Sequence, residues 1–462
     1  MIQYYKSNDK GLRMNKKLFK YYMIRGMGRC VLELQSTKSV DKYKELVLWA
    51  CTHNIAYDPQ CESVRASYVY SLTRFFGDDD IFVSAIINAI KRRSRYSDWD
   101  FKHMYELLEL FASDGNEAAR DALISEFEEL ISELNKKRRF NAYDHERDRL
   151  ETVCISLLSA FGKALAPYIA RALGSLFRHN PRYCGEDFDW FMICLSRELD
   201  KKKLKKLLGE ETDEVIIFFE EFCKTVNSED KYVRREVTIP NADDVVNEVD
   251  TWGRLSPASR VRFGRRADDS ERLKLAYAIL EEEDEDRKAE LLSTFEFKSE
   301  GFPLEHKPII EYTRSDNERL RDTAFGVLKY CRSDAVRNYA LELLSSGENT
   351  SHALSMLIMN YTPAHKKMLL DALYDLKIDY TDSTDWHGLG MQILDAYEKG
   401  VHLPKEFLMY IYETTLCSCC REYALAELAK HRWLTMEIIE ECRYDSKRSI
   451  SEYVNRYYKP QK

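Results

Sequence analysis

A nine-residue phrase, x-Arg-x-x-Ala-x-x-x-Leu, recurs along the chain and constrains its fold more than any other feature. It fits residues 320–328, 336–344 and 420–428, and residues 64–72 fit it with Tyr68 in place of the alanine. In an α-helix the alanine and the leucine lie on one stripe, where the small residue lets a neighbouring helix approach and the leucine fills the groove beside it. A short helical unit of this kind does not bury its apolar face alone, so we expect such units to stack.

The composition favours helix along almost the whole chain. Its 462 residues include only 17 glycines and 10 prolines, while 44% are hydrophobic and 32% are charged. Few helix breakers among many Leu, Ala, Glu, Lys and Arg residues predict an all-α fold with enough apolar residues to fill a core. Arg321 and Arg337 are 16 positions apart, the length of one helix and a turn, so they belong to the two arms of one helical hairpin.

We therefore expect an α-solenoid, a superhelix of stacked antiparallel helix pairs. The expected organisation is a loose extension at 1–13, a helical half at 14–226, a joint at 227–242 and a second helical half at 243–462. The joint is placed there because a charged stretch leads into REVTIP at 235–240, whose β-branched residues run into a proline and read as a strand.

Several helix starts carry recognisable capping residues. Ser315 with Glu318 matches a capping box, Ser333 precedes a helix, and Pro363 suits the first position of another helix. These signals place helix boundaries in the second half of the chain.

The residues around one of these helix starts resemble a known repeat family. Asp334, Val336 and Arg337 place an acidic residue before a Val-Arg pair. This pattern resembles the HEAT-repeat family, especially its short form, which also occurs in bilin lyases. The resemblance is clear at about 310–345 and weaker at about 60–76 and 416–431. It implies that the arginine is a strut between stacked units, with a packed stem and a head paired to an acidic residue.

Two polar stretches are candidate binding sites. The first comprises Arg25, Arg29, His53, Asn54, Tyr57, Asp58, Glu62, Arg65 and Tyr68. Converging in a helical hairpin, these side chains would suit a charged peptide or a small anion, although salt bridges between repeats explain them more simply. The second is Asp385-Trp386-His387, which offers a carboxylate, a stacking face and a titratable base. Its simpler explanation is a loop-to-helix junction.

The cysteines read mostly as buried thiols. Cys30, Cys51 and Cys154 lie inside apolar helical runs. Cys417 and Cys420 have C-x-x-C spacing at a helix start and are followed by His431 and Cys442, which makes a weak candidate for zinc. A second C-x-x-C pair at finger spacing is absent from the sequence, so we expect neither a metal nor a cofactor.

The charge pattern argues against a dedicated nucleic-acid binder. The formal net charge is -8, and basic runs such as 91–95, 136–139, 201–206 and 260–266 have acidic stretches nearby. The sequence lacks an apolar run long enough to span a membrane and an apolar segment near residue 1, so we expect a cytoplasmic protein.

These patterns favour binding over catalysis. The sequence has no P-loop, nucleophile elbow, H-E-x-x-H motif or kinase signature. We expect a non-enzymatic HEAT-like scaffold that binds a protein or peptide partner on its concave face. One alternative is a DNA repair protein similar to the HEAT-like alkylpurine glycosylases, with Asp385 and Trp386 near the lesion. Another is a small-molecule enzyme similar to bilin lyases.

Overall fold

The computed structural model describes residues 14–137, 145–179, 213–219, 238–297, 301–376 and 384–458. All regular structure within these ranges is helical, and none of their residues lies in a strand. The prediction of an all-α fold is therefore confirmed for the described chain.

The contacts divide the chain into two compact units. Unit 1 comprises residues 1–233, 416–422 and 434–462, and unit 2 comprises residues 234–415 and 423–433. The division passes through one continuous helix, α25 (Ser418–Lys430), whose first residues belong to unit 1 and whose later residues belong to unit 2.

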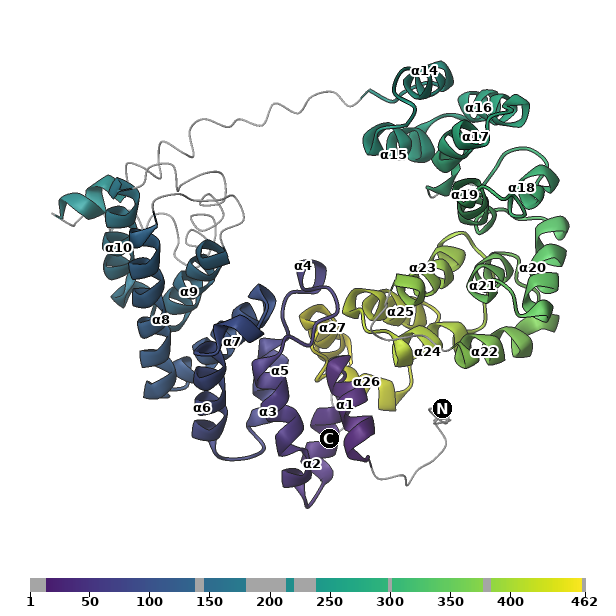
Figure 1. Cartoon of the computed structure of the whole chain (residues 1–462). Coiled ribbons are helices and arrows are strands. Elements are labelled where there is room, and N and C mark those ends of the chain that lie inside the picture. The colour runs from purple at the N-terminus through teal and green to yellow at the C-terminus, as the bar shows by residue number, and fades with distance from the viewer. Residues whose placement is uncertain are drawn as a thin grey trace. The chain divides into compact units, whose positions relative to one another are not determined.

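Unit 1 combines helices from both ends of the sequence (Figure 1). Its helices are α1 (Lys16–Ile24), α2 (Arg29–Ser36), α3 (Lys44–Thr52), α4 (Pro59–Glu62), α5 (Ala66–Thr73), α6 (Asp79–Ile90), α7 (Asp98–Ser113), α8 (Glu117–Lys136), α9 (His145–Phe161), α10 (Ala166–His179), α26 (Met436–Cys442) and α27 (Arg448–Tyr457). Helices pack on their second neighbours as well as on the next helix in sequence: α7 contacts α5 and α9 in addition to α6 and α8.

Unit 2 has the same pattern of neighbours. Its helices are α14 (Ala242–Trp252), α15 (Pro257–Arg266), α16 (Asp269–Glu281), α17 (Glu285–Leu292), α18 (Lys307–Tyr312), α19 (Glu318–Leu328), α20 (Asp334–Ser346), α21 (Thr350–Met359), α22 (Lys366–Asp375), α23 (Thr384–Glu398) and α24 (Lys405–Thr414). Here α21 packs on α20 and α22 and also on α23, two helices further on.

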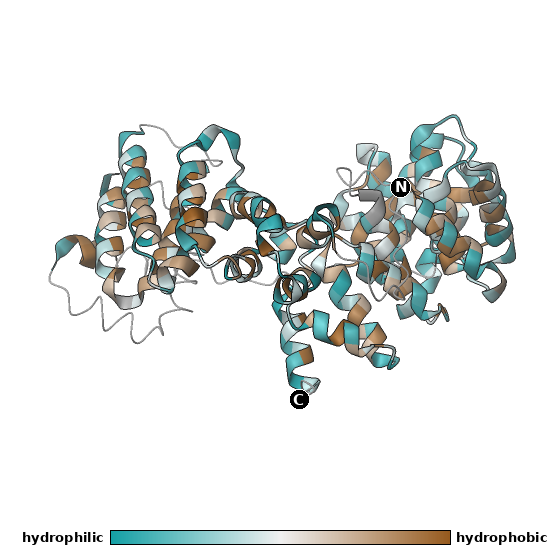
Figure 2. Ribbon diagram, turned by 90° about the horizontal axis from the view of Figure 1, so that it is seen from below, coloured by the Kyte–Doolittle hydropathy of each residue, from teal (hydrophilic) through white to brown (hydrophobic). Residues whose placement is uncertain are grey.

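Most helices are amphipathic, which is why they pack on their neighbours. In Figure 2 single helices carry both hydrophilic and hydrophobic residues along their length. Helix α7 buries Phe101, Met104, Leu108 and Phe111, a spacing of three and four residues that keeps the apolar side chains on one face. No helix in the described part of the chain is long and apolar enough to cross a membrane.

The helix caps show where the sequence signals were right and where they were wrong. Ser333 caps α20 by accepting a hydrogen bond from the amide of Val336, as predicted. The predicted capping box at Ser315 is wrong, because Asn317 caps α19 and accepts from the amide of Leu320. Ser315 lies in the preceding turn, where its hydroxyl donates to Glu285 at 3.0–3.1 Å.

Two other predictions near helix starts have different outcomes. Pro363 opens a short 3-10 turn, Pro363–His365, directly before α22, in agreement with the predicted helix start. Half of the predicted strand at 235–240 falls outside the described residues, and 238–240 form neither helix nor strand.

Candidate functional site

The first predicted polar stretch splits into a buried set and a dispersed set. The buried set meets residues from the far end of the sequence, inside unit 1. We call this group the N–C cluster; its members are Arg25, Arg29, Glu62, Arg65 and Tyr68 together with Arg421, Glu441 and Asp445. Sequence reasoning found the first five and missed the last three.

Arg65 forms the centre of the N–C cluster. Its guanidinium donates to the Glu62 carboxylate at 2.6 Å and to backbone carbonyls of Ile24, Ile55 and Leu416. Glu62 also accepts from the amide of Ser418 at 3.0 Å. Burial opposes ionisation of Glu62, but Arg65 and the Ser418 amide outweigh it, so the pKa of Glu62 lies below its ordinary value.

Two more ion pairs extend the cluster. Arg421 makes a bidentate pair with Asp445, at 2.8 and 2.9 Å, and both side chains are fully buried. Arg29 donates to Glu441 at 2.6 Å. These pairs join residues separated by as many as 412 positions in the sequence.

Glycines allow the two ends of unit 1 to approach so closely. The backbone carbonyl of Gly26 accepts a 2.8 Å hydrogen bond from the amide of Ser446, and a Cβ at Gly26 would lie 1.9 Å from the Ser446 hydroxyl. A Cβ at Gly28 would lie 2.0 Å from the carbonyl oxygen of Glu441. Gly26 and Gly28 therefore serve close contact between the two ends of unit 1.

The remaining residues of the first stretch have local structural roles. His53 hydrogen-bonds the carbonyl of Trp49 at 2.9 Å and stacks on its ring. The amide of Asn54 donates to Asp100, Asp58 caps α4, and Tyr57 is half-buried. The amide of Asp58 also donates to the Glu62 carboxylate at 3.1 Å, so this residue adjoins the N–C cluster.

A pocket of about 270 Å³ lies between α7 and α9, and sequence reasoning missed it. Its lining includes three carboxylates, from Asp98, Asp148 and Glu151, the ring of Trp99 and the ammonium group of Lys102. The signal in the sequence was weak, because acidic and aromatic residues at a helix start also read as ordinary capping.

The charge of Arg149, which also lines this pocket, is balanced by a buried carboxylate. Its guanidinium donates to the buried Glu126 carboxylate at 2.5 Å and to the hydroxyl of Tyr105 at 3.2 Å. Glu126 also pairs with Arg93, a residue of the basic run at 91–95. With Arg149 balanced in this way, the pocket wall presents more negative than positive charge.

The remaining sequence candidates are divided between the two units. His387, from the second polar stretch, belongs to unit 2, whereas Cys417 and Cys420 belong to unit 1. The side chains of Asp385 and Trp386 lie outside what the structure describes.

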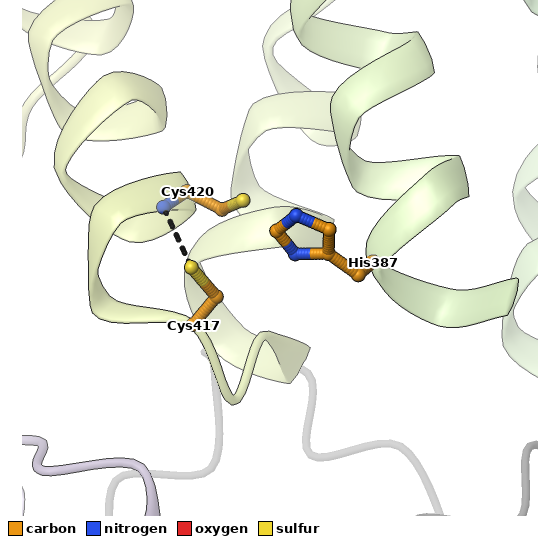
Figure 3. A group of neighbouring side chains, drawn as sticks. All are labelled: His387, Cys417 and Cys420. Carbon is orange, nitrogen blue, oxygen red and sulfur yellow. Dashed lines mark hydrogen bonds between the residues drawn. The ribbon is translucent and has the colours of Figure 1, made fainter. Parts of the chain in front are cut away.

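The surroundings of Cys417 and Cys420 disfavour isolated thiolates. The amide of Cys420 donates to the sulfur of Cys417 at 3.5 Å (Figure 3). Contact with Cys417 and burial raise the pKa of the Cys420 thiol well above its ordinary value. His431, which the sequence paired with these cysteines, stacks instead on Trp433, and Cys442 is buried in α26.

The chain has no match among known protein-family models, curated proteins or solved structures.

Proposed function

We propose that this chain is a HEAT-like α-solenoid binding protein that captures a protein or peptide partner, with a cationic side chain of the partner entering the α7–α9 pocket. The observation that carries the proposal is the pocket itself, with its three carboxylates and one tryptophan. Carboxylates attract a guanidinium or ammonium group, and an indole ring supports the same cation through its face.

The packing of the helices supports a repeat architecture. Contacts to the next helix and to the second neighbour, such as α7 with α8 and α9, are those that stacked helix pairs make. The recurring arginine phrase lies near the start of α5, α19, α20 and α25, so related sequence units stand at comparable places in these four helices. Both features are expected of a solenoid, whose surface serves recognition more often than chemistry.

The carboxylates that line the pocket outnumber its cations, which favours a basic partner segment. Lys102 lies 5.5 Å from the centre of the Trp99 ring and is one competing cation inside the pocket, and Arg147 approaches the Asp148 carboxylate at 3.9 Å. His145 pairs with Asp98 at 2.6 Å, which raises the pKa of His145. A guanidinium with two carboxylates within reach would displace Lys102 from the ring, because its planar fork matches carboxylate geometry better than an ammonium does.

The test is a binding assay of the full chain against an array of short peptides that vary in charge and in the position of Arg, Lys, Asp and Glu. We expect selection for peptides with an arginine or lysine, weakened by salt. The double variant Asp148→Asn/Glu151→Gln should weaken binding at least about tenfold, since it removes two of the pocket carboxylates.

The matched control is Glu117→Gln/Asp121→Asn, which removes two exposed carboxylates from α8 and changes the net charge equally. Its binding should stay within about twofold of the unmodified chain. An array without preference for basic residues, or equal loss in both double variants, would show that the pocket does not bind such partners.

A further inference from the structure

Helix α15 of unit 2 carries three exposed arginines on the side that faces away from its packing partners. Phe263 and Gly264 form the packed side, and a Cβ at Gly264 would lie 2.3 Å from a backbone carbonyl oxygen of the 3-10 turn that follows α17. The exposed residues on the opposite side, three and four positions apart, are Arg262, Arg265 and Arg266. At this spacing their side chains are neighbours on one helix face.

These arginines have no anionic partner in the part of the chain that the structure describes. Neither their side chains nor that of the exposed Arg254, which precedes α15, forms an ion pair or a hydrogen bond there. Arg260 differs, because it pairs with the buried Glu290 at 2.7 Å. Residues 251–267 hold five arginines and no acidic residue, although the whole chain has a net charge of -8. The outer side of α15 is therefore locally positive.

The nearest acidic residues in the sequence on either side of this stretch serve other contacts. Asp250 forms an ion pair with Arg287 of α17. Asp268 caps α16, where its carboxylate accepts hydrogen bonds from the amides of Ser270 and Glu271 at 3.0 Å. Acidic residues that are close in the sequence thus do not neutralise the outer side of α15.

An exposed aromatic ring lies close to the start of the same helix. Trp252, the last residue of α14, is 74% exposed, which is unusual for the largest apolar side chain. A nucleic-acid base stacks on such a ring, and bases of every kind do so because each has a π face. The outer side of α15 bears Ala258 besides its arginines, so it lacks the apolar stripe of a helix that lies in a membrane surface.

We propose that this surface binds a single-stranded nucleic acid, with the arginines on its phosphates and the indole stacked on an unpaired base. The arginine surface comprises Trp252, Arg254, Arg262, Arg265 and Arg266. The ten residues of α15 span about 15 Å, so the surface accommodates a strand of several nucleotides. It lies within unit 2 and is independent of the α7–α9 pocket of unit 1.

The experiment measures the fluorescence anisotropy of labelled oligouridine and oligothymidine strands of about 15 nucleotides, titrated with the full chain at several salt concentrations. Four phosphate contacts predict that the logarithm of the affinity falls with the logarithm of the salt concentration with a slope of about -3. The triple variant Arg262→Gln/Arg265→Gln/Arg266→Gln should bind at least about tenfold more weakly, with a slope of about -1, because one phosphate contact remains.

Two further variants separate this surface from net charge and phosphates from bases. Lys307→Gln/Lys367→Gln/Lys405→Gln removes three exposed cations from α18, α22 and α24 and changes the net charge of the chain equally. Its binding should stay within about twofold of the unmodified chain. Trp252→Ala should weaken binding at least about fivefold and leave the salt slope unchanged, because stacking involves no phosphate.

An abasic strand of the same length tests the base contact on the unmodified chain, and we expect it to bind as weakly to that chain as the normal strand binds to Trp252→Ala. Binding of the oligouridine or the oligothymidine strand with these properties supports the proposal. Equal losses in the two triple variants, no binding at low salt, or equally tight binding of a duplex of the same length would overturn it. Tighter binding to phosphatidylserine vesicles than to either strand would assign the surface to a membrane instead.

Discussion

The same phrase stands in two different settings in the two units. In unit 1, Arg65 and Arg421 are buried and tied to acidic residues, and Arg421 with Asp445 exposes 0% and 2% of the two side chains. In unit 2, Arg337 pairs only with Asp334 of its own helix, and these side chains expose 28% and 84%. Arg321 donates to the carbonyl of Ser315, six residues earlier.

The difference shows that the phrase determines a helix face, whereas the surroundings determine what the arginine does. The alanines of the phrase pack similarly in the three copies that have one, since Ala324, Ala340 and Ala424 are fully buried. An arginine becomes a strut where its head is buried against a distant part of the chain, as Arg421 is against Asp445 and Arg65 against the carbonyl of Leu416. Three experiments, from the largest expected effect to the smallest, test this distinction.

Removing the buried arginine of α25 should have the largest effect. Arg421→Met leaves the Asp445 carboxylate buried without its bidentate partner, and we expect the free energy of unfolding to fall by about 3–5 kcal/mol. Denaturant unfolding followed by circular dichroism measures it. The double variant Arg421→Met/Asp445→Leu should recover much of the loss, because no buried charge remains. A loss below about 1 kcal/mol in the single variant would contradict the strut role.

The contribution of the Glu62–Arg65 pair to the free energy of unfolding should depend on pH. Because the pKa of folded Glu62 lies below its ordinary value of 4.5, its carboxylate stabilises the fold above pH 4.5. That contribution is lost as the pH falls through the lower, folded pKa. Glu62→Gln should therefore cost about 2 kcal/mol at pH 7 and progressively less below pH 4.5. Unfolding curves of both chains across this range give the difference, and a constant difference would disprove the linkage.

The exposed copies should matter least. Arg337→Ala removes one half-exposed ion pair within a helix, so we expect a loss below about 1 kcal/mol in the free energy of unfolding. Added salt should shrink that loss further. If Arg337→Ala costs as much as Arg421→Met, the phrase itself would determine the energetics, and the comparison between the two units fails.

Local patterns in the sequence predicted local structure well. The scarcity of glycine and proline indicated helix, and Ser333 marked a helix start correctly. Asn317 was missed as a cap because three polar residues precede α19, and only the backbone path decides which one reaches the free amides.

Contacts between distant parts of the sequence were the ones that sequence reasoning missed. It singled out Arg29 and Arg65 but had no means of choosing Glu441 or Leu416 as their partners. Helical periodicity describes each helix and carries no register between helices. Asp148 and Glu151 met Trp99 for the same reason, through the packing of α9 on α7.

The separation between Arg29 and Glu441 in the sequence also determines how long Arg29 lacks its partner during synthesis. A ribosome that adds 5–20 residues per second needs about 20–80 s to make the 412 residues between them. Throughout that interval Gly26, Gly28 and their neighbouring arginines face solvent or a chaperone, while the helices of unit 2 emerge and can already fold. The first helices to leave the ribosome are therefore among the last to be completed.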